Sequence, residues 1–167
     1  KIAPKASHVE GLQKMCEEIR RKVDPSVEWL TREDLRTEIA WARENMGVVH
    51  KVFLADGDAL VAKARFLETL LDELYAAFPD LRRVSVYASP QSLALRTVEE
   101  MRRLAAKGLT LYYLGIESGD DQVLENLDKG VDAAEMIRVA NKAHEAGVKL
   151  STMILLGAGG REGSLRH

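Results

Sequence analysis

The chain has 167 residues and a mass of 18.6 kDa, the size of one domain. With 46% hydrophobic and 30% charged residues, the composition excludes a disordered or low-complexity protein. The net charge of −2 does not indicate a nucleic-acid-binding surface. The sequence contains no run of about 18 apolar residues, so no membrane span is predicted. The single cysteine, Cys16, cannot form an internal disulfide, which favours a reducing, cytoplasmic location.

Two helices are predicted before any strand. Ser7 to Glu10 has the pattern of a capping box, and the apolar residues that follow it recur at helical spacing to residue 23. A second helix is predicted over 31–46 and ends at Gly47, a position where glycine commonly follows a helix. We therefore expect residues 1–30 to be an N-terminal helical segment and residues 31–167 to form the core.

Strands and helices are predicted to alternate from residue 48 onward. Apolar runs predict strands near 48–55, 83–88, 109–116 and 148–156. Helical spacing predicts helices over 61–78, 97–108, 121–129 and 132–147. Strands separated by helices pair in parallel through right-handed crossovers, so we expect an α/β fold with a parallel sheet.

Ligands of parallel α/β folds bind at the carboxyl ends of the strands. Four segments follow the predicted strands there and are polar or glycine-rich: Asp56–Asp58, Ser89–Gln91, Glu117–Gly119 and Gly157–Glu162. A requirement for turns would explain any one of these segments. Four of them at one edge of a sheet favour a ligand site.

Glu117 is the strongest single candidate for a ligand-binding residue, because it directly follows a predicted strand. Its carboxylate could accept two hydrogen bonds from a ribose diol or bind an amine. The alternative is a partner for the N-terminus of the next helix, although Ser118 or Asp120 would fill that role better. Asp56 and Asp58 suit a cationic ligand group, or equally a tight turn at Gly57.

The glycine-rich segment 157–160 resembles a phosphate cradle only weakly. It is not GxGxxG, and no GK[ST] follows it. The histidines have no metal-ligand spacing.

At these strand ends the chain resembles the radical S-adenosylmethionine (radical SAM) superfamily. It looks most like the branch that groups the Elongator catalytic subunit, MiaB and NifB. The most specific part is Leu114-Gly115-Ile116-Glu117-Ser118-Gly119 with the downstream Lys129-Gly130. The other matching segments are Lys51–Leu60, Val84–Pro90 and Ile154–Gly160. The resemblance covers about residues 31–167.

The resemblance implies a partial TIM-like (βα)₆ barrel with four parallel strands in sequential order. Residues 31–167 would be its incomplete core, with an extra N-terminal helix. It also implies a cofactor site for S-adenosylmethionine. Gly57 and Asp58 match the loop that contacts the amino group, Glu117 matches the acid near the ribose or methionyl moiety, and Leu155 to Gly157 match the segment near adenine. Asp56, Ser89 and Ser118 lie in the same segments and are expected to join the site.

Family chemistry is the reductive cleavage of this sulfonium by a [4Fe–4S] cluster, which gives a 5′-deoxyadenosyl radical. The family holds its cluster through CxxxCxxC after the first strand, and this sequence has neither that motif nor a credible first strand. The chain starts at Lys1, and we expect it to be a fragment or incomplete core that does not act alone. A cluster is expected only if CxxxCxxC lies outside the sequence, and the substrate is not indicated.

Two alternatives stay open at this point. A degenerate barrel without a cluster could act as a nucleoside-binding or scaffold module. An unrelated flavodoxin-like domain would show a doubly wound strand order instead of a sequential one.

The lack of a first strand also predicts an exposed or partner-covered edge at the strand of residues 48–55. An open apolar edge invites association, so dimerisation through this edge is one expected consequence.

Overall fold

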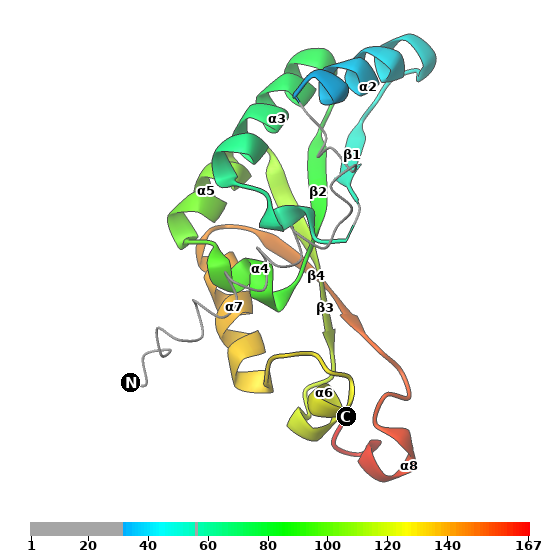
Figure 1. The fold of residues 1–167 in the computed structure, drawn as a ribbon, viewed down its shortest axis with the longest axis vertical. Coiled ribbons are helices and arrows are strands. Elements are labelled where there is room, and N and C mark those ends of the chain that lie inside the picture. The colour runs from blue at the N-terminus through cyan, green and yellow to red at the C-terminus, as the bar shows by residue number, and fades with distance from the viewer. Residues whose placement is uncertain (1–31, 56) are drawn as a thin grey trace. The chain divides into compact units, whose positions relative to one another are not determined.

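The computed structural model describes residues 32–55 and 57–167. Met46–His167 forms one compact unit (Figure 1). Helix α2 (Arg32–Asn45) belongs to a second unit, Lys1–Asn45, and matches the helix predicted over 31–46. The helix predicted over 7–23 lies outside the described residues.

Four strands form one parallel sheet in the 46–167 unit. They are β1 (Lys51–Leu54), β2 (Arg83–Ala88), β3 (Leu109–Glu117) and β4 (Lys149–Ile154). Each strand pairs with its neighbours in chain order, β1-β2-β3-β4. The predicted α/β class and sequential order are confirmed, and the doubly wound alternative is wrong. All four strands therefore end at the same edge of the sheet.

The helices connect these strands. They are η1 (Ala59–Val61), α3 (Ala64–Ala77), α4 (Pro90–Leu95), α5 (Val98–Ala106), α6 (Asp121–Asn126), α7 (Ala133–Glu145) and α8 (Gly160–Gly163). Helix α4 was not predicted, because Ser89–Gln91 was interpreted only as a polar segment that follows a strand. In the structure Ser89 caps α4, whose first residue is Pro90. Proline is favoured at this position, because the N–H group that it lacks would have no partner within the helix.

One face of the sheet is the core of the unit. Helices α3, α5 and α7 lie along this side of the sheet (Figure 1). Beneath them Val84, Val86, Tyr112 and Leu114 are fully buried, with relative exposures of 0%. Because side chains alternate between the two faces of a strand, the residues between these point the other way.

Aromatic side chains occupy that opposite face. The ring of Phe53 meets those of Tyr87 and Tyr113 edge-on, with centroids 4.6 and 5.3 Å apart. Phe53 and Tyr87 remain 39% and 42% exposed. The sheet is thus apolar on both faces, with one face covered by helices.

The ends of the strand order also bear on the prediction about the sheet edge. Strand β1 pairs only with β2 in the sheet of the described residues, as expected if no earlier strand precedes it. Dimerisation through this edge stays a prediction. Among the residues that the structure describes, no helix is long and apolar enough to cross a bilayer.

A close approach of two elements at Gly108 gives a stability prediction. Gly108 has a φ of +97°, and a Cβ there would overlap the hydroxyl group of Tyr75 on α3. An alanine in the left-handed conformation costs roughly 1–2 kcal/mol. Because of the added overlap with Tyr75, Gly108→Ala should lower the free energy of unfolding, measured by denaturant titration, by more than this amount. Gly147→Ala is the control, since its φ is +80° and no atom lies within 4 Å of the added Cβ. Equal losses in the two variants would contradict the packing argument.

Candidate functional site

The loop after β1 presents a half-buried acid, Asp58, at the strand edge. Gly57 is exposed with a φ of +72°, a conformation that glycine adopts without strain. The Oδ2 atom of Asp58 accepts hydrogen bonds from the hydroxyl of Ser89 and from its N–H, the latter at 3.2 Å. The Oδ1 atom of Asp58 is buried and has no hydrogen-bond partner among the described residues. A buried oxygen of this kind needs a partner, and a ligand donor would supply one. Asp56 lies outside the described residues.

Ser89 positions Asp58. Its Oγ atom accepts from the N–H of Ser92 at 3.0 Å, which closes the cap of α4, while its O–H group donates to Asp58. The hydroxyl is therefore fully engaged inside the protein. Ser89 holds the β1 loop against the β2 loop and leaves the carboxylate of Asp58 to meet a ligand.

The tip of β3 carries a second acid in an unusual backbone conformation. Glu117 has a φ of +60°, in the left-handed region that costs a non-glycine residue about 1–2 kcal/mol. The pairing of β3 with β4 shifts register between Gly115 and Glu117. A Cβ on Gly115 would overlap the Oε1 atom of Glu117, so the glycine makes room for this carboxylate. Such strain concentrates where a side chain must be aimed at a functional site.

Lys129 is the cationic partner of Glu117. Its Nζ atom lies 3.3 Å from Oε1 of Glu117, and the two side chains are 21% and 26% exposed. The backbone oxygen of Lys129 accepts from Nε2 of Gln91 at 2.9 Å, and Gln91 lies on α4. The loop after β2 is thereby tied to the segment that supports Glu117.

Ser118 is buried, with a relative exposure of 3%. Its Oγ atom accepts from the N–H of Asp120 at 3.1 Å and lies 2.9 Å from Nδ1 of His167. Asp120 in turn caps α6 and accepts from the N–H of Val123 at 3.0 Å. Ser118 and Asp120 thus organise the loop, which leaves the carboxylate of Glu117 outside the capping of α6.

The end of β4 lies beside Glu117. The N–H of Leu155 donates to the backbone oxygen of Glu117 at 3.0 Å, and the Leu155 side chain is 48% exposed. Gly157 has a φ of +84°, with open space around it. The N–H groups of Ala158 and Gly160 donate to the carbonyl oxygens of Leu155 and Gly157. Because turns use these two amides, the segment is not arranged as a phosphate cradle.

Three contacts therefore join the four strand ends in series. Asp58 meets Ser89, Gln91 meets Lys129 beside Glu117, and Glu117 meets Leu155. Four of the eight expected site residues form these contacts, namely Asp58, Ser89, Glu117 and Leu155. Gly57, Ser118 and Gly157 are their neighbours in the chain. Sequence reasoning quoted Lys129 as part of a motif and missed its ion pair with Glu117. The Gly115-Ile116-Glu117 spacing was the available signal, because a glycine two residues before the acid leaves room for its carboxylate.

The comparisons with known proteins bear on this arrangement. A family model described as the radical SAM superfamily matches residues 14–164. The comparison with curated proteins gave no match.

Three solved structures share the fold at low sequence identity. Methylornithine synthase (PylB) matches with a TM-score of 0.61 and 16% identity over 83% of this chain and 40% of that one. HydG, a maturase of the [FeFe]-hydrogenase, matches with a TM-score of 0.58 and 22% identity over 78% and 29%. Coproporphyrinogen III oxidase (HemN) from Escherichia coli matches with a TM-score of 0.55 and 19% identity over 72% and 28%. The chain spans less than half the length of each.

The iron–sulfur cluster that this family implies does not fit the residues of this sequence. Such clusters are held by several cysteine thiolates. The sequence has one cysteine, Cys16, which lies outside the described residues. Within the described ranges, no group of three or more His, Cys, Asp or Glu side chains is placed to hold a metal ion. The ligand set of a cluster is therefore not contained in this sequence.

The cap of α6 gives a prediction about pH. The hydrogen bond from the N–H of Val123, followed by that from Arg166, holds the pKa of Asp120 below its ordinary value of 3.8. The stability that this carboxylate contributes is complete above pH 3.8 and is lost as the pH falls through the lower folded value. Asp120→Ala should lower the melting temperature clearly near neutral pH and much less in strong acid. Asp80→Ala serves as a control, because Asp80 is exposed and its carboxylate makes no hydrogen bond or ion pair with the other described residues. A deficit for Asp120→Ala that does not change with pH would contradict the assignment.

Proposed function

The chain belongs to the radical SAM superfamily, and we propose that its 46–167 unit is the S-adenosylmethionine-binding part of an enzyme core of that family. The observation that carries the proposal is the buried Oδ1 atom of Asp58 at the carboxyl edge of the sheet, which has no hydrogen-bond partner among the described residues. A second acid, Glu117, ends the strand β3 at the same edge.

The chemistry of S-adenosylmethionine matches these two acids. The molecule carries an ammonium group, a sulfonium, a ribose diol and an apolar base, so its recognition needs acceptors and an apolar wall. The ammonium group would donate to Oδ1 of Asp58 in a charge-assisted hydrogen bond. The exposed backbone at Gly57 lets the main chain come close to the same group. Asp56 belongs to the same loop and is proposed to add negative charge there.

Glu117 and the end of β4 would hold the nucleoside half. Lys129 fixes the Oε1 atom of Glu117, which leaves Oε2 to accept from a ribose hydroxyl. The partly exposed side chain of Leu155 and the open backbone at Gly157 would lie against the base. Ser89 and Ser118 take part by positioning Asp58 and the loop after β3.

The reaction and the substrate of the whole protein are not part of this proposal. The residues described here bind and orient the cofactor, and a cluster would have to be held by cysteines from outside this sequence. We further propose the branch of the Elongator catalytic subunit, MiaB and NifB on the strength of the Leu114–Gly119 motif. A nucleoside-binding module without a cluster would use the same residues, and bound iron in the protein purified from its native source would distinguish an enzyme from it.

Replacement of Glu117 tests the proposal. A hydrogen bond to a charged group is worth roughly 1.5–3 kcal/mol, so Glu117→Gln should weaken S-adenosylmethionine binding by about 10- to 150-fold in calorimetric titration. The melting temperature should change little, because the carboxylate is partly exposed and Lys129 is its one ion-pair partner among the described residues.

Glu99→Gln is a matched control. Glu99 lies on α5 and is exposed, and it pairs with Arg102 of the same helix. Absence of binding to the unaltered chain at about millimolar ligand would refute the proposal. Unfolding of Glu117→Gln without ligand would instead make Glu117 a structural residue.

A further inference from the structure

A buried arginine lies behind the loop that carries Asp58. Arg96 follows the last residue of α4 and precedes Thr97, the N-cap of α5, and its relative exposure is 8%. Arginine is almost never buried to this extent without partners. Burial lowers the pKa of Arg96, while the nearby charges of Glu100 and Asp58 raise it. The hydrogen-bond partners of this guanidinium therefore indicate the role of Arg96.

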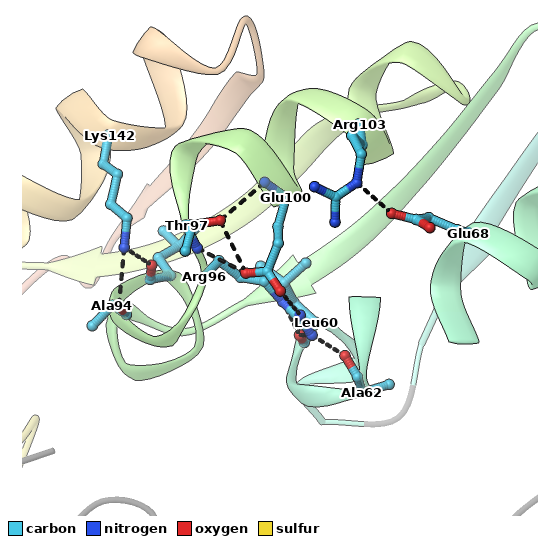
Figure 2. Close-up of polar contacts among 10 residues, drawn as sticks. Leu60, Ala62, Glu68, Ala94, Arg96, Thr97, Glu100, Arg103 and Lys142 are labelled. Carbon is cyan, nitrogen blue, oxygen red and sulfur yellow. Dashed lines mark hydrogen bonds and ion pairs between the residues drawn. The ribbon is translucent and has the colours of Figure 1, made fainter. Parts of the chain in front are cut away.

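Those partners are carbonyl groups of the loop after β1. The Nε and Nη2 atoms of Arg96 donate to the backbone oxygen of Leu60 at 3.2 and 2.8 Å, and Nη2 also donates to the backbone oxygen of Ala62 (Figure 2). Leu60 lies within η1, and Ala62 follows its last residue. The end of a helix leaves carbonyl groups without partners, and the planar guanidinium binds two of them at once.

Other residues hold Arg96 in this position. The Oε1 atom of Glu100 lies 3.6 Å from its Nη1 atom, and Oε2 of Glu100 accepts from the N–H of Thr97 at 2.9 Å. Figure 2 also shows Lys142 of α7 reaching the end of α4, where its Nζ atom donates to the carbonyl oxygens of Leu93 and Ala94. The helix α4 and the arginine that follows it are thus anchored to α5 and α7.

Hydrogen bonds from the two ends of α4 hold the loop after β1 at two points. Ser89 at the N-cap holds the carboxylate of Asp58, and Arg96 at the C-cap holds the carbonyl groups of Leu60 and Ala62. We propose that Arg96 is a positioning residue that sets the geometry of Gly57 and Asp58 for the amino-acid end of S-adenosylmethionine. This inference rests on the proposed function and concerns one half of the ligand only.

The contrast with Arg103 shows why the role is specific. Arg103 lies on helix α5, which begins just after Arg96, and pairs with Glu68 of α3 at 2.9 Å (Figure 2). Its side chain is 48% exposed. Within the described part of the chain, Arg103 makes no hydrogen bond or ion pair with the loop after β1, and it joins α5 to α3 instead. Arg103→Met therefore removes an arginine from the same region without releasing the loop.

Two ligands separate positioning from general stabilisation. S-adenosylmethionine has both an amino-acid end and a nucleoside end, whereas 5′-methylthioadenosine has only the nucleoside end. In calorimetric titration of the 167-residue chain, Arg96→Met should weaken binding of the first ligand by about tenfold or more. In Arg96→Met the affinity for 5′-methylthioadenosine should change by less than about twofold. In Arg103→Met the affinities for both ligands should change by less than about twofold.

Amide hydrogen exchange supplies a readout without any ligand. In Arg96→Met the N–H groups of Val61 and Ala62, which donate to Asp58 and Ala59, should exchange faster. The N–H groups of Tyr112 and Leu114 in the centre of the sheet should keep their protection. Arg96→Lys should fall between, because an ammonium group keeps the charge and loses the planar fork. If Arg96→Met does not fold, Arg96→Lys is compared with the unaltered chain instead.

Several results would overturn the inference. Equal weakening of both ligands, or faster exchange across the whole sheet, would make Arg96 a general stabilising residue. Unchanged exchange at Val61 and Ala62 would show that it does not hold the loop. If the unaltered chain binds neither ligand, the proposed function fails, and the exchange data alone then decide whether Arg96 fixes the loop.

Discussion

Parallel pairing in chain order is the constraint on which this structure depends. Because β1 to β4 run in one direction and lie side by side, the loop after each strand leaves from the same edge. Hydrogen bonds then join these loops in series, from Asp58 to Ser89, from Gln91 to Lys129, and from Glu117 to the N–H of Leu155. A site assembled this way needs no long-range charge field, which agrees with the near-zero net charge of the chain.

The two acids at this edge are held by different means. Asp58 has one oxygen committed to Ser89 and the other buried without a partner in the described part of the chain. Glu117 is aimed by its backbone, since its left-handed φ and the absence of a side chain at Gly115 let the carboxylate fold toward Lys129. One site thus combines a carboxylate fixed by hydrogen bonds with a carboxylate fixed by backbone strain. Both arrangements reduce the entropy that a ligand must remove on binding.

The sequence predicted the strands well because their signal is local. The predicted strand 83–88 has the bounds of β2, and its apolar residues Val84 and Val86 are fully buried. Helix α4 was missed because Ser89-Pro90 both follows a strand and starts a helix, and the segment was interpreted only as a strand end that could bind a ligand. The role of Arg96 had no local signal, since its carbonyl partners lie 36 and 34 residues away in the chain. The conformation of Glu117 depends on a register shift against β4, which no single segment encodes.

The most direct test of the central claim is an amide chemical-shift map of the chain during titration with S-adenosylmethionine. The account predicts that the largest changes occur at the N–H groups of Gly57 and Asp58, at Glu117 and Ser118, and from Leu155 to Gly157. The amides of α3 and α5, on the covered side of the sheet, should change little. Saturable changes confined to those helices, with none at the strand ends, would contradict the claim that the carboxyl edge of this sheet binds the cofactor.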